Sequence, residues 1–188
     1  MNEKEWVESV ISLVPERMRA TDPSLGIDSA KRLTYAHEIR DYEGSEPKTR
    51  NSILYETDVL VTEETEENVW KPRVVVEAKL ARITTHDAIT YSEKASTHKH
   101  VHPYLRYGIL IGDRKHYPLP GRLFRHGAYF DFMVSWMGLV PTESELDRFV
   151  TLILSEVQAS RHLEDILYTS RQRGRSKYTL LHKPLVLE

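Results

Sequence analysis

The chain has 188 residues, a length that suits one domain with its own hydrophobic core. It contains no cysteine, which excludes a disulfide framework, a thiolate zinc site and a cysteine nucleophile. The formal net charge is −2 at pH 7, and no apolar run approaches the ~20 residues that cross a bilayer. We therefore expect a soluble, cytoplasmic protein with no membrane partner.

The N-terminal part is predicted to form two helices followed by two strands. Apolar residues recur with a helical period at its start, and Pro15 is expected to break or kink that helix. The expected elements are a helix over 3–20, a loop over 21–26, a helix over 29–39 with Ser29 as N-cap, a polar loop over 42–50, a strand over 53–62, a solvated hairpin connection over 63–72 and a strand over 73–80.

The remainder of the chain is predicted to alternate helices and strands. The expected elements are a helix from about 84 to 97, a strand over 104–112, a loop over 118–121, a strand over 129–136 and a long helix capped by Thr142 with Glu145 as its capping-box partner. This order predicts an α/β fold with a central mixed sheet flanked by helices. The first two strands are expected to form an antiparallel hairpin, and the next helix to cross to a later strand.

We expect a single domain over residues 1–188, with its core over about residues 30–140 and a C-terminal helix and basic tail over 142–188. The charges are divided unevenly along this chain. Residues 1–81 carry 17 acids and 11 bases, whereas residues 82–126 carry 3 acids, 8 bases and six of the nine histidines. A cationic segment beside an acidic one suits contact with phosphates and a metal, although uneven charge alone does not decide the matter.

Two of the predicted strands carry charges within apolar runs. Asp58 lies in the first, and Glu77 and Lys79 lie two residues apart in the second. Side chains alternate along a strand, so Glu77 and Lys79 leave the same face about 7 Å apart. Buried charges are costly unless they are paired or hold a cation, which makes the strand pair a candidate active site. The alternative is an exposed strand face with solvated charges.

Asp58, followed nineteen residues later by Glu77-Ala78-Lys79, resembles the active-site pattern of the PD-(D/E)XK nuclease superfamily. That superfamily includes type II restriction endonucleases, the nuclease domain of type I restriction enzymes and RecB-like nucleases. Thr57 stands where the family has a proline. The resemblance covers roughly residues 38–112 and implies a restriction-endonuclease-like fold that cleaves double-stranded DNA with Mg²⁺, for which Mn²⁺ can substitute.

The resemblance also implies a role for each residue of the pattern. Asp58, Glu77 and the Ala78 backbone carbonyl would hold the metal, since Mg²⁺ prefers oxygen ligands. Lys79 would orient the attacking water and stabilise the developing negative charge. Many members place a glutamate of an N-terminal helix near the metal, which makes Glu38 a further candidate ligand.

Several other residues are weaker candidates. Relatives often carry Gln-x-x-x-Tyr in the helix after the second strand, and this chain has Asp87 and Tyr91 there. Tyr91 either lines the site or belongs to the core. Other candidates for site lining or DNA contact are Lys94, His98 and the tail residues Arg171, Arg173 and Arg175.

Two alternatives concern the metal ligands. Glu56 lies on the same strand as Asp58 and competes with Glu38 as an additional ligand. His98, His100 and His102 would share one face if their segment were a strand, which suggests a zinc site.

The resemblance implies a restriction or phage-defence nuclease that works as a homodimer or as a subunit of a larger complex. The main alternative is a non-catalytic DNA-binding or assembly subunit that retains the fold. A third possibility is an RNA substrate.

Overall fold

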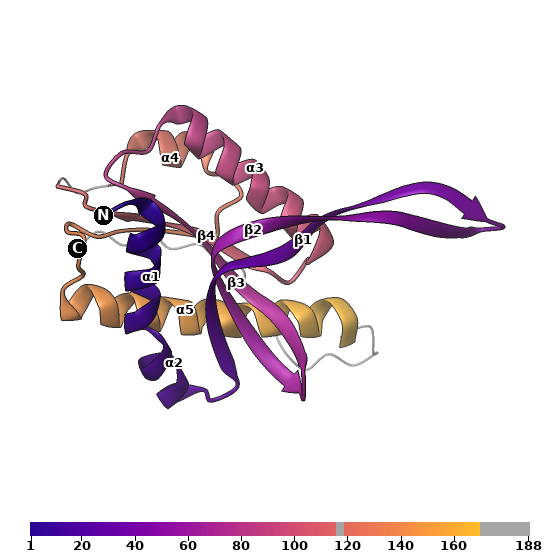
Figure 1. Ribbon diagram of the computed structural model, residues 1–188, viewed down its shortest axis with the longest axis horizontal. Coiled ribbons are helices and arrows are strands. Elements are labelled where there is room, and N and C mark those ends of the chain that lie inside the picture. Colours follow the sequence, from indigo (N-terminus) through magenta and orange to yellow (C-terminus); the bar gives the residue numbers. More distant parts are fainter. Residues whose placement is uncertain (116–118, 170–188) are drawn as a thin grey trace.

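Five strands form one mixed sheet at the centre of the fold, in the order β1-β2-β3-β4-β5 (Figure 1). The structure, a computed structural model, describes residues 1–115 and 119–169. The strands are β1 (Leu25–Glu43), β2 (Glu46–Glu66), β3 (Val69–Leu80), β4 (Arg106–Gly112) and β5 (Phe132–Ser135). The helices are α1 (Glu3–Leu13), α2 (Pro15–Thr21), α3 (Thr85–Val101), α4 (Gly121–His126) and α5 (Glu143–Glu164), and a π-helical turn (Asp165–Thr169) follows α5.

The sheet combines antiparallel and parallel pairing. β2 pairs antiparallel with both β1 and β3, whereas β3, β4 and β5 run parallel. Parallel neighbours need a crossover connection, and α3 supplies it between β3 and β4. The predicted α/β class, with a mixed sheet flanked by helices, is confirmed. The predicted antiparallel pairing of the strands that contain Asp58 and Glu77 is confirmed as well.

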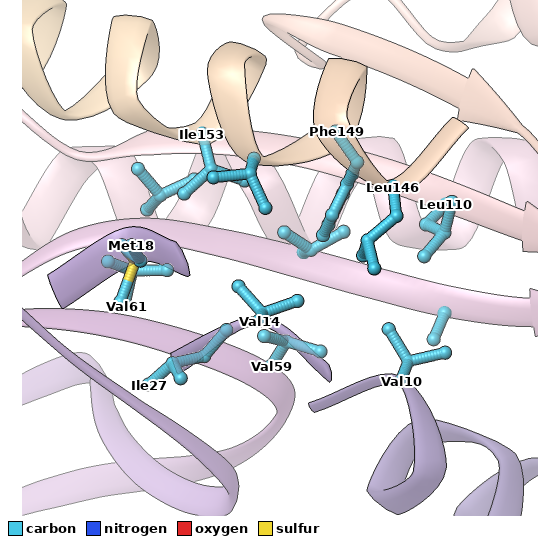
Figure 2. Close-up of a cluster of buried hydrophobic side chains, with 14 of the residues drawn as sticks. Val10, Val14, Met18, Ile27, Val59, Val61, Leu110, Leu146, Phe149 and Ile153 are labelled. Carbon is cyan, nitrogen blue, oxygen red and sulfur yellow. The ribbon is translucent and has the colours of Figure 1, made fainter. Parts of the chain in front are cut away.

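Helices α1, α2 and α5 cover one face of the sheet (Figure 1). Pro15 occupies the first position of α2, where its missing N–H costs nothing, so the predicted break after α1 is confirmed. Thr142 and Glu145 form the predicted capping box of α5. Figure 2 shows the resulting core, in which apolar side chains of these helices meet those of the sheet, among them Val10, Val14, Met18, Val59, Val61, Phe149 and Ile153.

Helices α3 and α4 cover the opposite face. Ala95 of α3 and Leu123 of α4 belong to the same buried cluster as Leu60 and Val75 of the sheet. α3 also buries charged and polar side chains, including Lys94. The layer between α3 and the sheet is therefore partly apolar and partly charged, unlike the layer beneath α5.

The predicted helix over 29–39 is wrong, because this segment lies within β1. β1 pairs with β2 from Leu25, opposite Glu63, to Glu43, opposite Glu46. Leu33 to Tyr35 favour extended structure, and the hydrogen bonds to β2 override a weak local helical preference. The strand is revealed only by its pairing with β2, whose partner residues lie between 10 and 30 residues further along the chain.

The connections on both sides of β2 are shorter than predicted. Residues 42–50 are mostly strand, and the turn is confined to Gly44 and Ser45. Gly44 has φ of +61°, which glycine adopts without the steric cost of a side chain. Residues 63–72 are likewise strand except at Glu67 and Asn68. The outer part of β1 and β2 projects beyond the helices as a two-stranded ribbon (Figure 1).

The C-terminal elements follow the predicted order with one addition. β4 and β5 lie inside the predicted strands over 104–112 and 129–136, and α4, between them, is a helix that the sequence pattern does not indicate. Within the described residues, none of the helices is both long and apolar enough to cross a membrane.

Gly108 provides a test of the packing between β4 and β5. A Cβ atom on Gly108 would lie 2.2 Å from the ring of Phe132, which pairs with it across the sheet. We expect Gly108→Ala to lower the free energy of unfolding by about 1–3 kcal/mol in urea denaturation, the usual cost of overpacking. Gly121→Ala is the control, because its Cβ would meet only Arg125 at 3.5 Å. Equal losses in the two variants would contradict this packing.

Candidate functional site

Asp58, Glu77 and Lys79 are directed to the same face of the sheet. Leu60 of β2 pairs with Val75 of β3, and both side chains belong to the cluster beneath α3. Asp58 precedes Leu60 by two residues, while Glu77 and Lys79 follow Val75 by two and four. Because side chains alternate along a strand, all three charged groups face α3.

The Asp58 carboxylate accepts the hydrogen bond of a β3 backbone N–H at the point where β2 and β3 stop pairing. The ladder between these strands ends with Val59 opposite Val76. Beyond it, the Ala78 N–H donates to Oδ2 of Asp58 at 2.8 Å. The N–H and C=O of a strand residue leave the same edge of the strand, so the Ala78 carbonyl is also directed toward β2. Side-chain and backbone oxygens of two strands thus converge.

Glu77 is a buried carboxylate that receives partners from two other elements. Its exposure is 1%. Nζ of Lys94, on α3, lies 2.8 Å from Oε1 of Glu77, and the hydroxyl of Tyr107, on β4, donates to the same oxygen. Burial, reinforced by the Glu77 charge, raises the pKa of Tyr107 well above its ordinary value, so the hydroxyl keeps its proton. These contacts fix the orientation of the Glu77 carboxylate.

Lys79 pairs with a glutamate that the sequence pattern does not indicate. Its Nζ lies 2.6 Å from Oε1 of Glu3, in the first turn of α1. Burial disfavours the charged form of Lys79, but the hydrogen bond and charge of Glu3, together with Tyr91, outweigh burial and raise its pKa. Lys79 is therefore a permanent cation at neutral pH.

Tyr91 stands between the two lysines of the site. Its ring centroid is 4.9 Å from Nζ of Lys79 and 5.1 Å from Nζ of Lys94. Lys94 also contacts the ring of Tyr55, on β2, with its Nζ 4.3 Å from the ring centroid. Aromatic faces attract ammonium groups and hold them in place. Tyr91 contacts both lysines and also packs against the cluster beneath α3, and its role in lining an active site stays a prediction.

Among the described residues, no cation lies within ion-pair distance of Asp58, in contrast to Glu77. Burial raises the pKa of Asp58 to about 6, and the negative charge of Glu77 acts in the same direction. The Ala78 N–H and the charges of Lys94 and Lys79 oppose this rise without cancelling it. Two carboxylates thus share a partly desolvated location, which favours a cation between them.

The arrangement fits a small divalent cation. Mg²⁺ is commonly bound by one or two carboxylates and keeps several waters. Within the described residues, Oδ1 of Asp58 and Oε2 of Glu77 make no hydrogen bond. In the part of the chain that the structure describes, no three Asp, Glu, His or Cys side chains are placed so that they could together hold a metal ion. The Ala78 carbonyl, water and a substrate phosphate would complete the coordination.

Glu38 lies away from this site. It belongs to β1 rather than to a helix, and Asn51 of β2 donates to it at 3.2 Å. Asn51 precedes Asp58 by seven residues, which is about 23 Å along an extended strand. Glu56, the competing candidate, is exposed to solvent. The helix glutamate beside the site is Glu3.

The histidines near the end of α3 do not form the proposed zinc site. Their segment is helical, so His100 points to a different side from His98 and His102. His98 is fully buried, stacks on Tyr107 and has its pKa lowered to about 4 by burial. The predicted phosphate contact of His98 is therefore wrong, because a buried neutral ring cannot reach a phosphate. Arg171, Arg173 and Arg175 lie outside the described residues.

Three contact residues escape prediction from sequence. Glu3 has the appearance of an ordinary acid in the first turn of a helix, where it favours the helix dipole. Tyr107 and Tyr55 occupy strand positions that aromatic residues commonly fill. The packing of α1 brings Glu3 to Lys79, the packing of α3 brings Lys94 to Tyr55, and the pairing of β4 with β3 brings Tyr107 to Glu77. No signal in the neighbouring residues predicts these contacts.

The raised pKa of Asp58 predicts a pH-dependent stability. The unfolded chain releases this proton near pH 3.8, whereas the folded protein holds it to about pH 6. Without divalent metal, the contribution of Asp58 to the free energy of unfolding is fully present below about pH 3.8. It should be lost as pH rises through about 6, which lowers the free energy of unfolding by up to about 3 kcal/mol. Asp58→Asn keeps an acceptor for Ala78 and should be more stable than wild type at neutral pH, by about 1–3 kcal/mol in urea denaturation.

Asp28→Asn is the matched control, because Asp28 is a half-exposed partner of Lys31 on β1. It should leave the pH profile unchanged. Mg²⁺ should stabilise the wild type and not Asp58→Asn. A difference between wild type and Asp58→Asn that is the same at acidic and neutral pH would contradict the assignment.

The chain matches no known protein-family model, and a search of curated proteins finds no match. Inference about function therefore depends on the geometry of β2, β3 and α3.

Proposed function

We propose that the chain is a Mg²⁺-dependent endonuclease that hydrolyses phosphodiester bonds in double-stranded DNA. The observation that carries this proposal is the meeting of Asp58, Glu77 and Lys79 on one face of two adjacent strands. Hydrolysis of a phosphodiester needs oxygen ligands for a cation and a fixed positive charge beside the phosphate. These three side chains supply both, and their resemblance to the PD-(D/E)XK pattern supports the same reaction.

Asp58 and Glu77 would hold the cation together with the Ala78 carbonyl. A bound Mg²⁺ supplies Lewis-acid polarisation of the phosphate and makes a bound water more acidic. Lys94 and Tyr107 hold one oxygen of Glu77, which leaves its other oxygen in a fixed direction. Mn²⁺ accepts the same oxygen ligands and is expected to substitute.

Lys79 would act as a positive charge and not as a base. Its raised pKa keeps the ammonium protonated at neutral pH, so it cannot accept a proton from water. It can donate hydrogen bonds to the attacking water and to a phosphate oxygen, whose negative charge grows during the reaction. Glu3 holds the ammonium in place, and as a helix glutamate beside the site it replaces Glu38 as the candidate that the resemblance suggested for such a position.

One observation favours a second function. Glu77 is already paired with Lys94, and Lys79 with Glu3, so most charges of the site are compensated within the protein. Ion pairs that are already satisfied within the protein would also suit a non-catalytic DNA-binding or assembly subunit that retains the fold. Such a subunit would bind DNA without cutting it.

The biological setting belongs to the same proposal. A restriction or phage-defence nuclease must cut both strands of a duplex, which needs two sites related by symmetry or two passages of one site. The active form would therefore be a homodimer or part of a larger complex.

Plasmid cleavage tests the proposed activity. The wild type should nick or linearise plasmid DNA with Mg²⁺ and should be inactive in EDTA. Asp58→Asn and Lys79→Met should each lower the rate by at least about 10²-fold, the usual effect of removing one group that stabilises the transition state. Both variants should retain the fold by circular dichroism.

Lys71→Gln is the matched control on the same strand. Its ammonium pairs with Glu164, at the opposite end of β3 from Lys79, and its cleavage rate should stay within about twofold of wild type. Undiminished cutting by Lys79→Met would exclude the mechanism. DNA binding by a wild type that cuts nothing would favour the non-catalytic subunit.

A further inference from the structure

Four arginines lie in or close to the loop that follows the strand of Lys79: one belongs to the loop, two donate hydrogen bonds to it, and the fourth follows one of these two by three residues in α4. We name them the basic rim: Arg82 in that loop, Arg114 after β4, and Arg122 and Arg125 in α4. Arg82 follows Lys79 by three residues, so their backbones are at most about 10 Å apart. The rim therefore begins next to the candidate site.

Hydrogen bonds attach the rim to this loop. Nη1 of Arg114 donates to the Ala81 carbonyl at 3.0 Å, and Nη1 of Arg122 donates to the Ile83 carbonyl at 2.8 Å. These bonds use one donor of each guanidinium and involve no negative charge. A guanidinium has five N–H donors, so both side chains keep donors for a phosphate.

The rim arginines differ from other arginines of the protein in their pairing. Arg17, Arg73, Arg106 and Arg161 each contact two carboxylates or more. In the described parts of the chain, the four rim arginines have no carboxylate within ion-pair distance. No carboxylate of the described residues therefore compensates their charges, which leaves them to an anionic partner.

The difference in ion pairing shows which residues give the segment over 82–126 its excess positive charge. Three cations of that segment, Lys94, Lys99 and Arg106, contact buried or half-buried acids. The four rim arginines and the exposed Lys115 remain. Two exposed histidines, His86 in α3 and His126 in α4, lie within four residues of Arg82 and Arg125. The excess charge visible in the sequence is thus concentrated at one edge of the candidate site.

We propose that the basic rim binds the phosphate backbone of duplex DNA and guides one strand to Lys79. The proposal rests on the proposed nuclease function for its choice of DNA. A polyanion with regularly spaced phosphates can satisfy several guanidinium groups at once and continue into a site that holds a cation and Lys79. Contacts to phosphates fix position and carry no base sequence, so the rim supplies affinity and register.

Salt-dependent DNA binding tests the rim apart from cleavage. Fluorescence anisotropy of a short labelled duplex would be measured in EDTA with Asp58→Asn as the parent protein, which prevents cutting. Adding Arg82→Gln and Arg125→Gln should make the negative slope of log K against log salt shallower by about 0.9 per arginine. The same changes should weaken DNA binding at about 0.1 M salt by roughly 10- to 60-fold. Neither side chain makes a hydrogen bond within the described residues, so the fold should be retained.

The control changes the same number of charges elsewhere. Arg32→Gln with Arg40→Gln removes two exposed cations from β1 and should leave the slope unchanged. If the rim pair alters folding, Arg82→Lys with Arg125→Lys keeps the charges and should preserve the slope.

Three results would overturn the proposal: an unchanged slope in the rim variant, an equal loss in the control, or tighter rim-dependent binding of duplex RNA than of DNA. Loss of rim-dependent binding together with normal plasmid cutting would reject the rim and leave the nuclease proposal standing. DNA binding that depends on the rim, by a wild type that does not cut, would support the rim and reject the nuclease proposal.

Discussion

A carboxylate buried at the centre of a sheet must be compensated, and the compensation of Glu77 joins three elements of this protein. Lys94 comes from the crossover helix α3 and Tyr107 from the neighbouring strand β4. Loss of Lys94 would leave a buried charge unpaired, at a cost of about 3–5 kcal/mol. Loss of the Tyr107 hydroxyl would remove a hydrogen bond to that charge, at a cost of about 1.5–3 kcal/mol. α3 therefore packs on the sheet through a lysine as well as through alanines, which explains why this helix lacks a continuous apolar face.

The electrostatic balance of the site follows from this arrangement. Three acids, Glu3, Asp58 and Glu77, surround two lysines, so one negative charge remains in excess. The excess resides on Asp58, whose neighbours include Glu77 and whose pKa is raised by burial. A divalent cation would stabilise both carboxylates at once, and the ammonium of Lys79 would remain beside it for an anionic substrate. Without metal, the ionised Asp58 carboxylate thus lowers the free energy of unfolding, and this carboxylate is the group that the proposed function uses to bind a cation.

Local patterns predict one part of the fold and long-range pairing decides the rest. Alternation and apolar runs locate the strands of Asp58, Glu77 and Lys79, and capping boxes locate the starts of α3 and α5, because these signals lie within a few residues. The segment of Glu38 has no strong signal of its own, and its pairing with β2 makes it a strand. Glu3 and Tyr107 reach the site only through the packing of distant elements, so their roles cannot be predicted from neighbouring residues.

The convergence of Asp58 and Glu77 on one cation is tested most directly by anomalous diffraction from crystals soaked in Mn²⁺. The geometry predicts an anomalous peak bonded to both carboxylates, beside Ala78, and its absence from crystals of Asp58→Asn. Saturating Mn²⁺ that leaves no peak between these two side chains, or that binds only elsewhere on the protein, would contradict it.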